Sequence, residues 1–234
     1  MNENQNKDES IIETFEYGYI RRISTKWNDL EDLGKKEIIK MKIIKIKVYI
    51  GLYDQKKVIF GISTTFKNLI TGEIKETLPH KGSLDFLDIK EFVIGNDEYL
   101  TDFYIQFPFF DLDYILQIGY GTNKRKFLVP EKSDEVGENK YVSENGRNNI
   151  IIGTFGHFSE KLDATGCFFV PKKDYMKFIL FSFFMLRHKS KNDAQFKEEW
   201  DKKYKNIPIE YQYIWKFINL DEKPFKSIIK YCFI

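Results

Sequence analysis

The chain has 234 residues, of which 42% are hydrophobic and 17% aromatic. This composition can bury a substantial core and excludes a disordered protein. Basic and acidic residues nearly cancel, at 37 against 35, so no single electrostatic field covers the molecule. The N-terminal sequence MNENQNKDES has neither an apolar nor an Arg-rich leader pattern, and two cysteines favour a reducing compartment. The longest apolar run, residues 178–186, is about half of the ~20 residues that a membrane span requires. We therefore expect a soluble, intracellular, cytoplasmic protein without a membrane span.

The first 171 residues have the pattern of an all-β protein. Residues 1–17 are polar and predict a flexible N-terminal arm. From Ile38 the hydrophobic period is two, and IKIKVYI (residues 44–50) predicts a half-buried antiparallel strand. Further short β-type segments follow, separated by turn signals, and the polar residues 130–149 predict a long solvated loop. Residues 18–171 are thus expected to form a sandwich, barrel or prism.

The pattern changes after Pro171. The apolar segment YMKFILFSFFML (residues 175–186) has to pack against other residues, and residues 172–234 hold 14 basic and 8 acidic side chains. In the segment that follows, Ser190 and Asp193 have the spacing of a capping box, and three aromatic residues recur every four positions. We expect residues 172–234 to form a basic, aromatic-rich and largely helical C-terminal extension. The recurring aromatic residues are Phe196, Trp200 and Tyr204.

Several segments of the β-type region resemble jacalin-related lectins. NNIIIGTFGHFSEKLDATGCFFV (148–170) is similar to the family's terminal signature IVGFxGRSGxYLDAIGxYV, and WND at Trp27 is similar to its early WDDG. EFVIGNDEYLTDFYIQF (91–107) resembles the EYLTxIxG strand, and YILQIGYGTNKRKF (114–127) resembles the SLTFxTNKRxYGP hairpin. The resemblance covers roughly residues 27–171. It implies a mainly β fold, the β-prism I of three four-stranded Greek-key sheets, and it does not cover the helical extension that the residue pattern predicts after Pro171.

The resemblance also implies a carbohydrate site in a GxxxD loop, where the aspartate accepts hydrogen bonds from two sugar hydroxyls. A carboxylate suits this role because it only accepts hydrogen bonds and can take two donors. The aspartate is present here as Asp163, but Ser159 replaces the glycine, and the family's glycine-rich first loop has no counterpart. Asp163 is therefore either a sugar-hydroxyl acceptor or a turn aspartate that shapes its own loop. The neighbouring charged pair is expected to be solvated. The candidate carbohydrate-binding residues are Ser159, Glu160, Lys161, Leu162 and Asp163.

Other classes of function find little support in the sequence. The three histidines are scattered, and no HExxH, CxxC, Ser-centred elbow or phosphate-cradling glycine loop appears. We expect no enzyme activity, catalytic residue, cofactor or metal. In the extension, lysines alternate with acidic residues, so we expect no nucleic-acid partner. Its aromatic residues are typical of a protein interface, and the candidate partner-binding residues are Phe196, Trp200, Tyr204 and Trp215.

Two hypotheses for the function follow. In the first, the chain is a non-catalytic lectin-fold module that binds carbohydrate through the 159–163 loop. In the second, it is a degenerate lectin fold that serves as a structural or interaction subunit of a larger intracellular assembly, docked through residues 172–234. The partner is a carbohydrate in the first case and a protein in the second.

Overall fold

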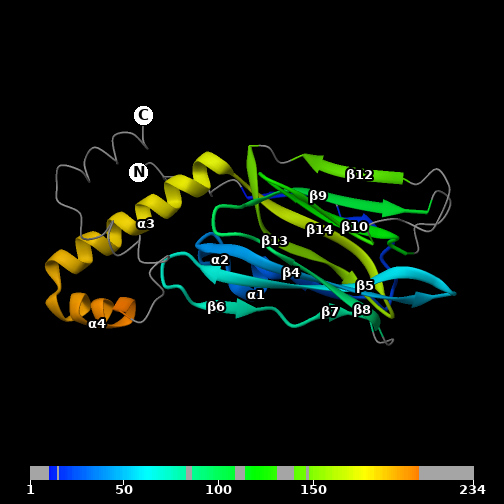
Figure 1. Ribbon diagram of the computed structural model, residues 1–234, viewed down its shortest axis with the longest axis horizontal. Coiled ribbons are helices and arrows are strands. Elements are labelled where there is room, and N and C mark those ends of the chain that lie inside the picture. Colours follow the sequence, from blue (N-terminus) through cyan, green and yellow to red (C-terminus); the bar gives the residue numbers. More distant parts are fainter. Residues whose placement is uncertain are drawn as a thin grey trace, which may run out of the picture. The chain divides into compact units, whose positions relative to one another are not determined.

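The computed structural model of the chain describes residues 11–14, 16–82, 86–108, 114–130, 140–145 and 148–205. The chain divides into two compact units, residues 1–172 and residues 173–234. The described part of the first unit consists mainly of β-strands, whereas that of the second unit is helical (Figure 1). Among the described residues, no helix is long and apolar enough to cross a membrane.

Three antiparallel sheets form the described part of the first unit, and the main path of each has four strands. One sheet has the order β1-β14-β13-β3, with β2 also paired to β14, and its strands are β1 (Ile12–Glu13), β2 (Tyr17–Gly18), β3 (Thr25–Asn28), β13 (Asn149–Phe158) and β14 (Leu162–Pro171). The next has the order β6-β5-β4-β8, with β7 also paired to β5, and its strands are β4 (Met41–Tyr53), β5 (Lys56–Asn68), β6 (Ile74–Glu76), β7 (His80–Lys81) and β8 (Phe86–Val93).

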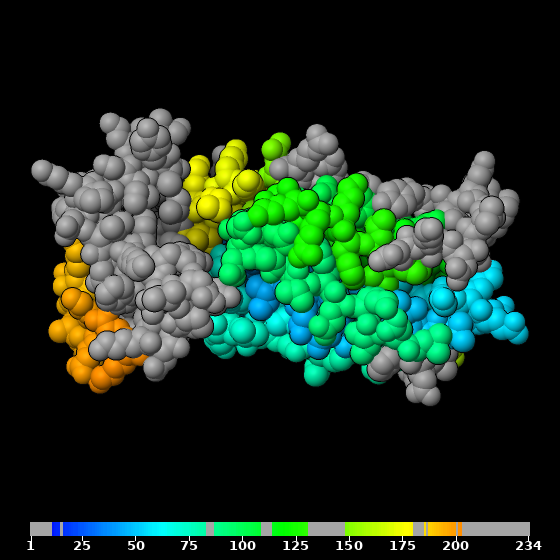
Figure 2. All heavy atoms as spheres, viewed as in Figure 1, coloured from blue at the N-terminus to red at the C-terminus, as the bar shows by residue number. Residues whose placement is uncertain are grey.

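The third sheet has the order β11-β10-β9-β12 and consists of β9 (Leu100–Phe107), β10 (Gln117–Thr122), β11 (Lys126–Val129) and β12 (Lys140–Asn145). Strands β8 to β11, coloured teal to green, cover much of the face of the first unit that Figure 2 shows. Two short helices, α1 (Asp29–Leu33) and α2 (Lys35–Ile38), connect β3 to β4. The predicted prism of three sheets is confirmed.

The alternation predicted for residues 44–50 is found in part in strand β4. Ile46, Val48 and Ile50 are buried in the core. On the opposite face Lys47 pairs with Glu76 at 2.6 Å, as the period predicted, but Tyr49, expected on the same solvent-facing side, is buried. The register shifts between Ile43 and Lys45, which takes Ile44 out of the buried row.

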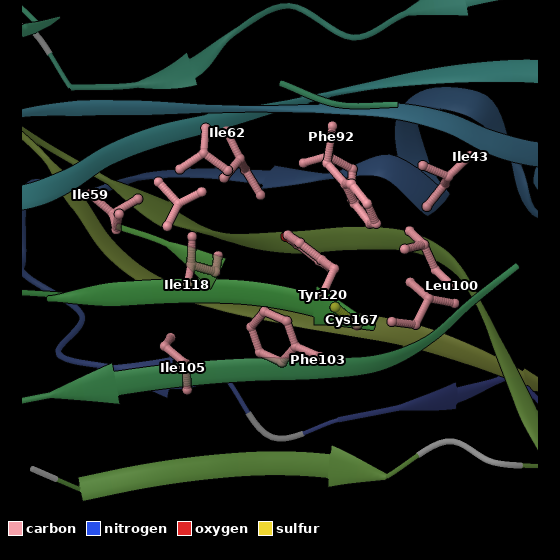
Figure 3. Packing of buried hydrophobic residues seen from close by; sticks show 14 of the residues in the cluster. Ile43, Ile59, Ile62, Phe92, Leu100, Phe103, Ile105, Ile118, Tyr120 and Cys167 are labelled. Atoms are coloured by element: carbon pink, nitrogen blue, oxygen red, sulfur yellow. The ribbon is translucent and has the colours of Figure 1, made fainter. Parts of the chain in front are cut away.

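The core lies between the three sheets, and each sheet contributes to it. Ile62 and Phe92 come from the β4-containing sheet, Ile105 and Ile118 from the β9-containing sheet, and Cys167 from β14 (Figure 3). These side chains are at most 3% exposed. No one of the sheets could bury its apolar face alone, so the packing of all three is what stabilises the unit.

Two segments expected to lack regular structure are strands instead. The N-terminal arm was predicted to extend through residue 17, but Ile12–Glu13 and Tyr17–Gly18 pair with β14. The solvated loop predicted for residues 130–149 contains β12, which pairs with β9. For these described residues the predictions were wrong, because main-chain hydrogen bonds to an open sheet edge decide such pairings.

The second unit contains helices α3 (Lys172–Asn192) and α4 (Ala194–Lys205), which confirms its helical character over the described residues. Asp193 caps α4, since its Oδ1 accepts a hydrogen bond from the Phe196 N–H at 2.9 Å. Ser190 is no part of this cap. It lies inside α3 and donates to the Arg187 carbonyl, so the predicted capping box with Ser190 as its first residue was wrong, and the cap of α4 lies three residues later.

Gly156 marks a place where the sheet leaves no room for a side chain. A Cβ there would lie 2.2 Å from the Ala164 carbonyl oxygen and 2.5 Å from the Trp27 ring. We predict that Gly156→Ala lowers the free energy of unfolding by about 2 kcal/mol, the usual cost of overpacking. Chemical denaturation measures it. Gly95→Ala is the control, because a Cβ there makes only ordinary contact, 3.4 Å from Glu98. Equal stability of the two variants would contradict the packing described.

Candidate ligand-binding edge at Asp163

The candidate loop connects β13 to β14. Phe158 pairs with Leu162, and the Ser159 N–H donates to the Lys161 carbonyl at 3.0 Å, which closes a tight turn between the strands. A polar turn between two strands is what the sequence predicted here. The five candidate residues differ in their exposure to solvent. Glu160 is exposed and Ser159 is half-buried, whereas Lys161, Leu162 and Asp163 are completely buried.

The Asp163 carboxylate is surrounded by donors from its own chain. Ser24 Oγ donates to Oδ2 at 2.6 Å, and Ser159 Oγ donates to Oδ1 at 3.0 Å. The Arg21 guanidinium Nε lies 3.8 Å from Oδ1. Hydroxyl donors of this kind stabilise a buried carboxylate, and the nearby positive charge offsets part of its desolvation. Two hydroxyls on the two oxygens are also what the resemblance implied a sugar would provide.

Residues 19–24 hold these donors in place. Strand β2 pairs Gly18 with Ala164, and the Tyr19 N–H donates to the Asp163 carbonyl at 3.2 Å. Gly18 has a φ of +135°, and a Cβ there would lie 2.1 Å from that carbonyl oxygen. Ser24 Oγ in turn accepts a hydrogen bond from the Arg21 N–H at 3.1 Å. The segment is therefore tied to Asp163 through both backbone and side chains.

Sequence reasoning missed Arg21 and Ser24. Ser24 lies 139 positions from Asp163, and no motif connects the two. The available signal was weak: one glycine, Gly18, stands nine positions before the WND segment that resembled the early family motif. A glycine at that point could have indicated a close backbone approach.

Lys161 corrects the expectation of a solvated charged pair. Its side chain is completely buried, and its Nζ lies 4.2 Å from the centre of the Tyr53 ring. The ammonium group thus has a cation–π contact with the end of β4. Glu160 does remain exposed, as expected. The difference arises because neighbouring residues in a turn point in different directions, and only one of them faces Tyr53.

The backbone of the loop is also covered. A Cβ at Gly82 would lie 1.7 Å from the Glu160 carbonyl oxygen and 2.5 Å from the Lys161 nitrogen, so Gly82 packs directly against this peptide group. The Gly82 N–H donates to the Phe60 carbonyl at 3.0 Å, which fixes it to β5. The loop is therefore covered by residues 19–24 on one part and by Gly82, which follows β7, on another.

The covering segment presents apolar side chains to solvent. Tyr19 is 55% exposed, Ile20 is 51% exposed and Ile23 is 79% exposed. Arg22 between them is also exposed. We call residues 19–24 the covering loop. Its inner side binds Asp163, and its outer side exposes three large apolar groups within five positions.

The other candidate residues lie in the second unit. Phe196, Trp200 and Tyr204 are all on α4 with the predicted spacing of four, and Lys189 Nζ lies 4.3 Å from the centre of the Phe196 ring. Trp215 lies outside the described residues. Possible metal-ligating atoms also gather in the described part of the chain, at Asp29, Asp32 and His80, and not in the 159–163 loop.

Comparison with known proteins agrees on the fold. No family model and no curated protein matches the sequence. Solved structures do match: Calystegia sepium agglutinin has 17% identity and a TM-score of 0.53, covering 70% of this chain and 98% of its own. Artocarpin in complex with mannopentose has 21% identity and a TM-score of 0.51, covering 69% and 98%. A mannose-binding jacalin-related lectin from Ananas comosus has 12% identity and a TM-score of 0.50, with the same coverage. The chain has the jacalin-related lectin fold. At these identities the similarity concerns the fold alone, and the aligned share corresponds to the length of one lectin domain.

We predict that Asp163→Ala lowers the free energy of unfolding by about 3 kcal/mol, because the Ser24 and Ser159 hydroxyls and the Arg21 guanidinium lose their common acceptor. Ser24→Ala should cost less, about 1 kcal/mol. Denaturant unfolding measures both. Glu160→Ala, an exposed carboxylate of the same loop, is the control and should change stability little. An Asp163→Ala variant as stable as this control would show that the carboxylate has no structural role.

Proposed function

We propose that this chain is a non-catalytic binding module with the lectin fold, which binds a protein partner through the outer surface of the covering loop, residues 19–24. The observation that carries the proposal is the complete burial of Asp163. Each of its carboxylate oxygens accepts a hydrogen bond from a hydroxyl of the same chain. The acceptor that sugar binding needs is thus already occupied.

The energetics of exchange weigh against a sugar at this position. A sugar hydroxyl that displaced Ser24 or Ser159 would replace one hydroxyl–carboxylate bond by another of similar strength. It would also have to move the covering loop, breaking the bond from the Tyr19 N–H to the Asp163 carbonyl and separating Arg21 from the carboxylate. The exchange of hydrogen bonds would contribute little free energy, and this would have to offset the lost contacts of the covering loop. We therefore expect weak or absent affinity for sugar.

The outer side of the covering loop supports a protein partner instead. Tyr19, Ile20 and Ile23 are each more than half exposed, and aromatic and aliphatic groups of this size are typical of the buried centre of a protein interface. The loop is held from below by Asp163 and β14, so little conformational entropy would be lost when a partner binds it. Arg22 adds one exposed charge for orientation.

Carbohydrate binding is the second candidate function, and one observation favours it. Ser24 and Ser159 reach Asp163 much as a pair of sugar hydroxyls would, so the aspartate keeps the chemistry of an acceptor for two donors. Artocarpin, which has this fold, was solved in complex with mannopentose, and the Ananas comosus lectin is described as mannose binding. In this chain a sugar would bind only after the covering loop had moved.

A titration of the full chain with mannose and mannotriose, followed through NMR chemical shifts, distinguishes the two candidate functions. We expect no saturable shift at the Asp163 edge. Glu160→Gln serves as the neutral comparison and Asp163→Asn as the site variant. Saturable binding that Asp163→Asn abolishes and Glu160→Gln retains would overturn the protein-binding proposal in favour of the lectin activity.

The protein partner is tested with the double variant Tyr19→Ser/Ile23→Ser in quantitative co-precipitation from the chain's own cells. We expect this variant to lose a partner that the unaltered chain retains, with an unchanged melting temperature because both side chains point to solvent. Leu78→Ser is the matched control, an 83% exposed leucine outside the covering loop. An identical set of partners for the double variant and the unaltered chain would contradict a role for this surface.

A further inference from the structure

Three side chains that can bind metals converge beside Trp27. Asp29, Asp32 and His80 each place one ligand atom within 4.8 Å of the others. Asp29 is the first residue of α1, and Asp32 follows three positions later, on the same face of the helix. His80 opens β7. The group thus combines two carboxylates and one imidazole from parts of the chain that lie about 50 positions apart in the sequence.

The first carboxylate is held in a fixed orientation. Asp29 is completely buried, and its Oδ2 accepts hydrogen bonds from the Thr154 N–H at 2.8 Å and from Thr154 Oγ1 at 2.9 Å. Oδ1 is thereby turned toward His80, with its distance to Nε2 at 3.7 Å. Contacts of this kind around a ligand residue are what fixes metal-binding carboxylates in known sites.

The imidazole is held as firmly. The His80 ring stacks on Trp27, with the ring centres 5.0 Å apart and an angle of 11° between their planes. Phe158 covers the ring from another direction, with the centres 6.4 Å apart. His80 is 8% exposed, so Nε2 points into the protein and faces the Asp29 carboxylate.

The two facing atoms have no hydrogen-bond partner in the described part of the chain. Asp29 Oδ1 and His80 Nε2 are both buried and make no hydrogen bond there. Their 3.7 Å separation exceeds the roughly 3.2 Å limit of a good N–H···O bond. Two ligands of a tetrahedral zinc ion, each about 2.1 Å from it, lie about 3.4 Å apart. The observed distance is closer to that of two atoms sharing an ion, and a buried carboxylate oxygen without a hydrogen bond calls for such a ligand.

We propose that Asp29, Asp32 and His80 bind a divalent transition-metal ion such as Zn²⁺. An imidazole nitrogen in the ligand set disfavours Ca²⁺ and Mg²⁺, which prefer oxygen ligands alone, and two carboxylates balance the charge of the ion. Asp32 is exposed, so the ion reaches the site from solvent and retains a position for water. The ion has a structural role: it connects α1, which is fixed to β13 through Thr154, with β7 of another sheet.

The test is calorimetric titration of the metal-free full chain with ZnCl₂, followed by thermal unfolding with and without Zn²⁺. We expect one ion per chain and a higher melting temperature with the ion, because the folded state alone has the site. Asp32→Asn should weaken Zn²⁺ binding at least tenfold while leaving the melting temperature of the metal-free chain unchanged, since Asp32 is exposed. His80→Gln should abolish binding. Co²⁺ in place of Zn²⁺ should give visible absorption that both variants reduce.

Two controls separate this site from chance binding. Glu31→Gln removes an exposed carboxylate of the same helix α1, and His157→Gln removes another histidine that lies beside a carboxylate, Glu16, at 2.5 Å. Both should bind Zn²⁺ as the unaltered chain does. The proposal is overturned if the folded chain does not bind Zn²⁺, or if Asp32→Asn binds it with unchanged affinity. Loss of binding in His157→Gln alone would place the ion elsewhere and overturn it equally.

Discussion

A completely buried carboxylate needs hydrogen-bond donors or positive charges as partners. At Asp163 the described residues of the same chain supply them. Ser24 and Ser159 donate to the two oxygens, and Arg21 adds a positive charge. These contacts tie the covering loop to β14, and with it the pairing of β2. The state of the whole edge therefore depends on this one group. The same interactions that stabilise the carboxylate remove it from solvent, so structural use and ligand binding compete for the same lone pairs.

The hairpin formed by β13 and β14 anchors two buried carboxylates with different surroundings. Asp163, on β14, is matched by hydroxyls and a guanidinium of the chain. Asp29 is held by Thr154 of β13 through one oxygen only, while its other oxygen faces His80. A carboxylate whose two oxygens both accept hydrogen bonds from the chain has a structural role, whereas a carboxylate oxygen that faces a second metal-binding atom indicates a place for an ion. The difference lies in the partners and not in the residue type.

The jacalin-related lectin fold explains the scaffold and leaves the function to the individual sites. Three sheets around a common core fix where loops emerge, and the chemistry of those loops decides what binds. Here the loop that the resemblance assigned to sugar binding is covered by the covering loop and by Gly82. The side chains left outside, Tyr19, Ile20 and Ile23, are apolar. A fold associated with recognition of polar ligands thus presents an apolar surface at this edge.

The sequence by itself determined the elements whose signals are local. The alternation in β4, the terminal β13–β14 hairpin, and helix α4 could all be predicted, because hydrophobic period depends on residues within a few positions. The family signature around Asp163 added the prism. The boundaries were less accurate where strands are short, as for β1, β2 and β12.

Only the tertiary structure decided what surrounds the functional groups. The burial of Lys161 against Tyr53, the closure of Asp163 by Ser24, and the meeting of Asp29 with His80 join residues from distant parts of the chain. Such contacts leave no periodic trace, since each side chain alone is compatible with a solvated turn. Whether a carboxylate serves a ligand, an ion or its own chain is set by the donors and charges that packing brings within about 4 Å of it, and that environment exists only in the folded chain.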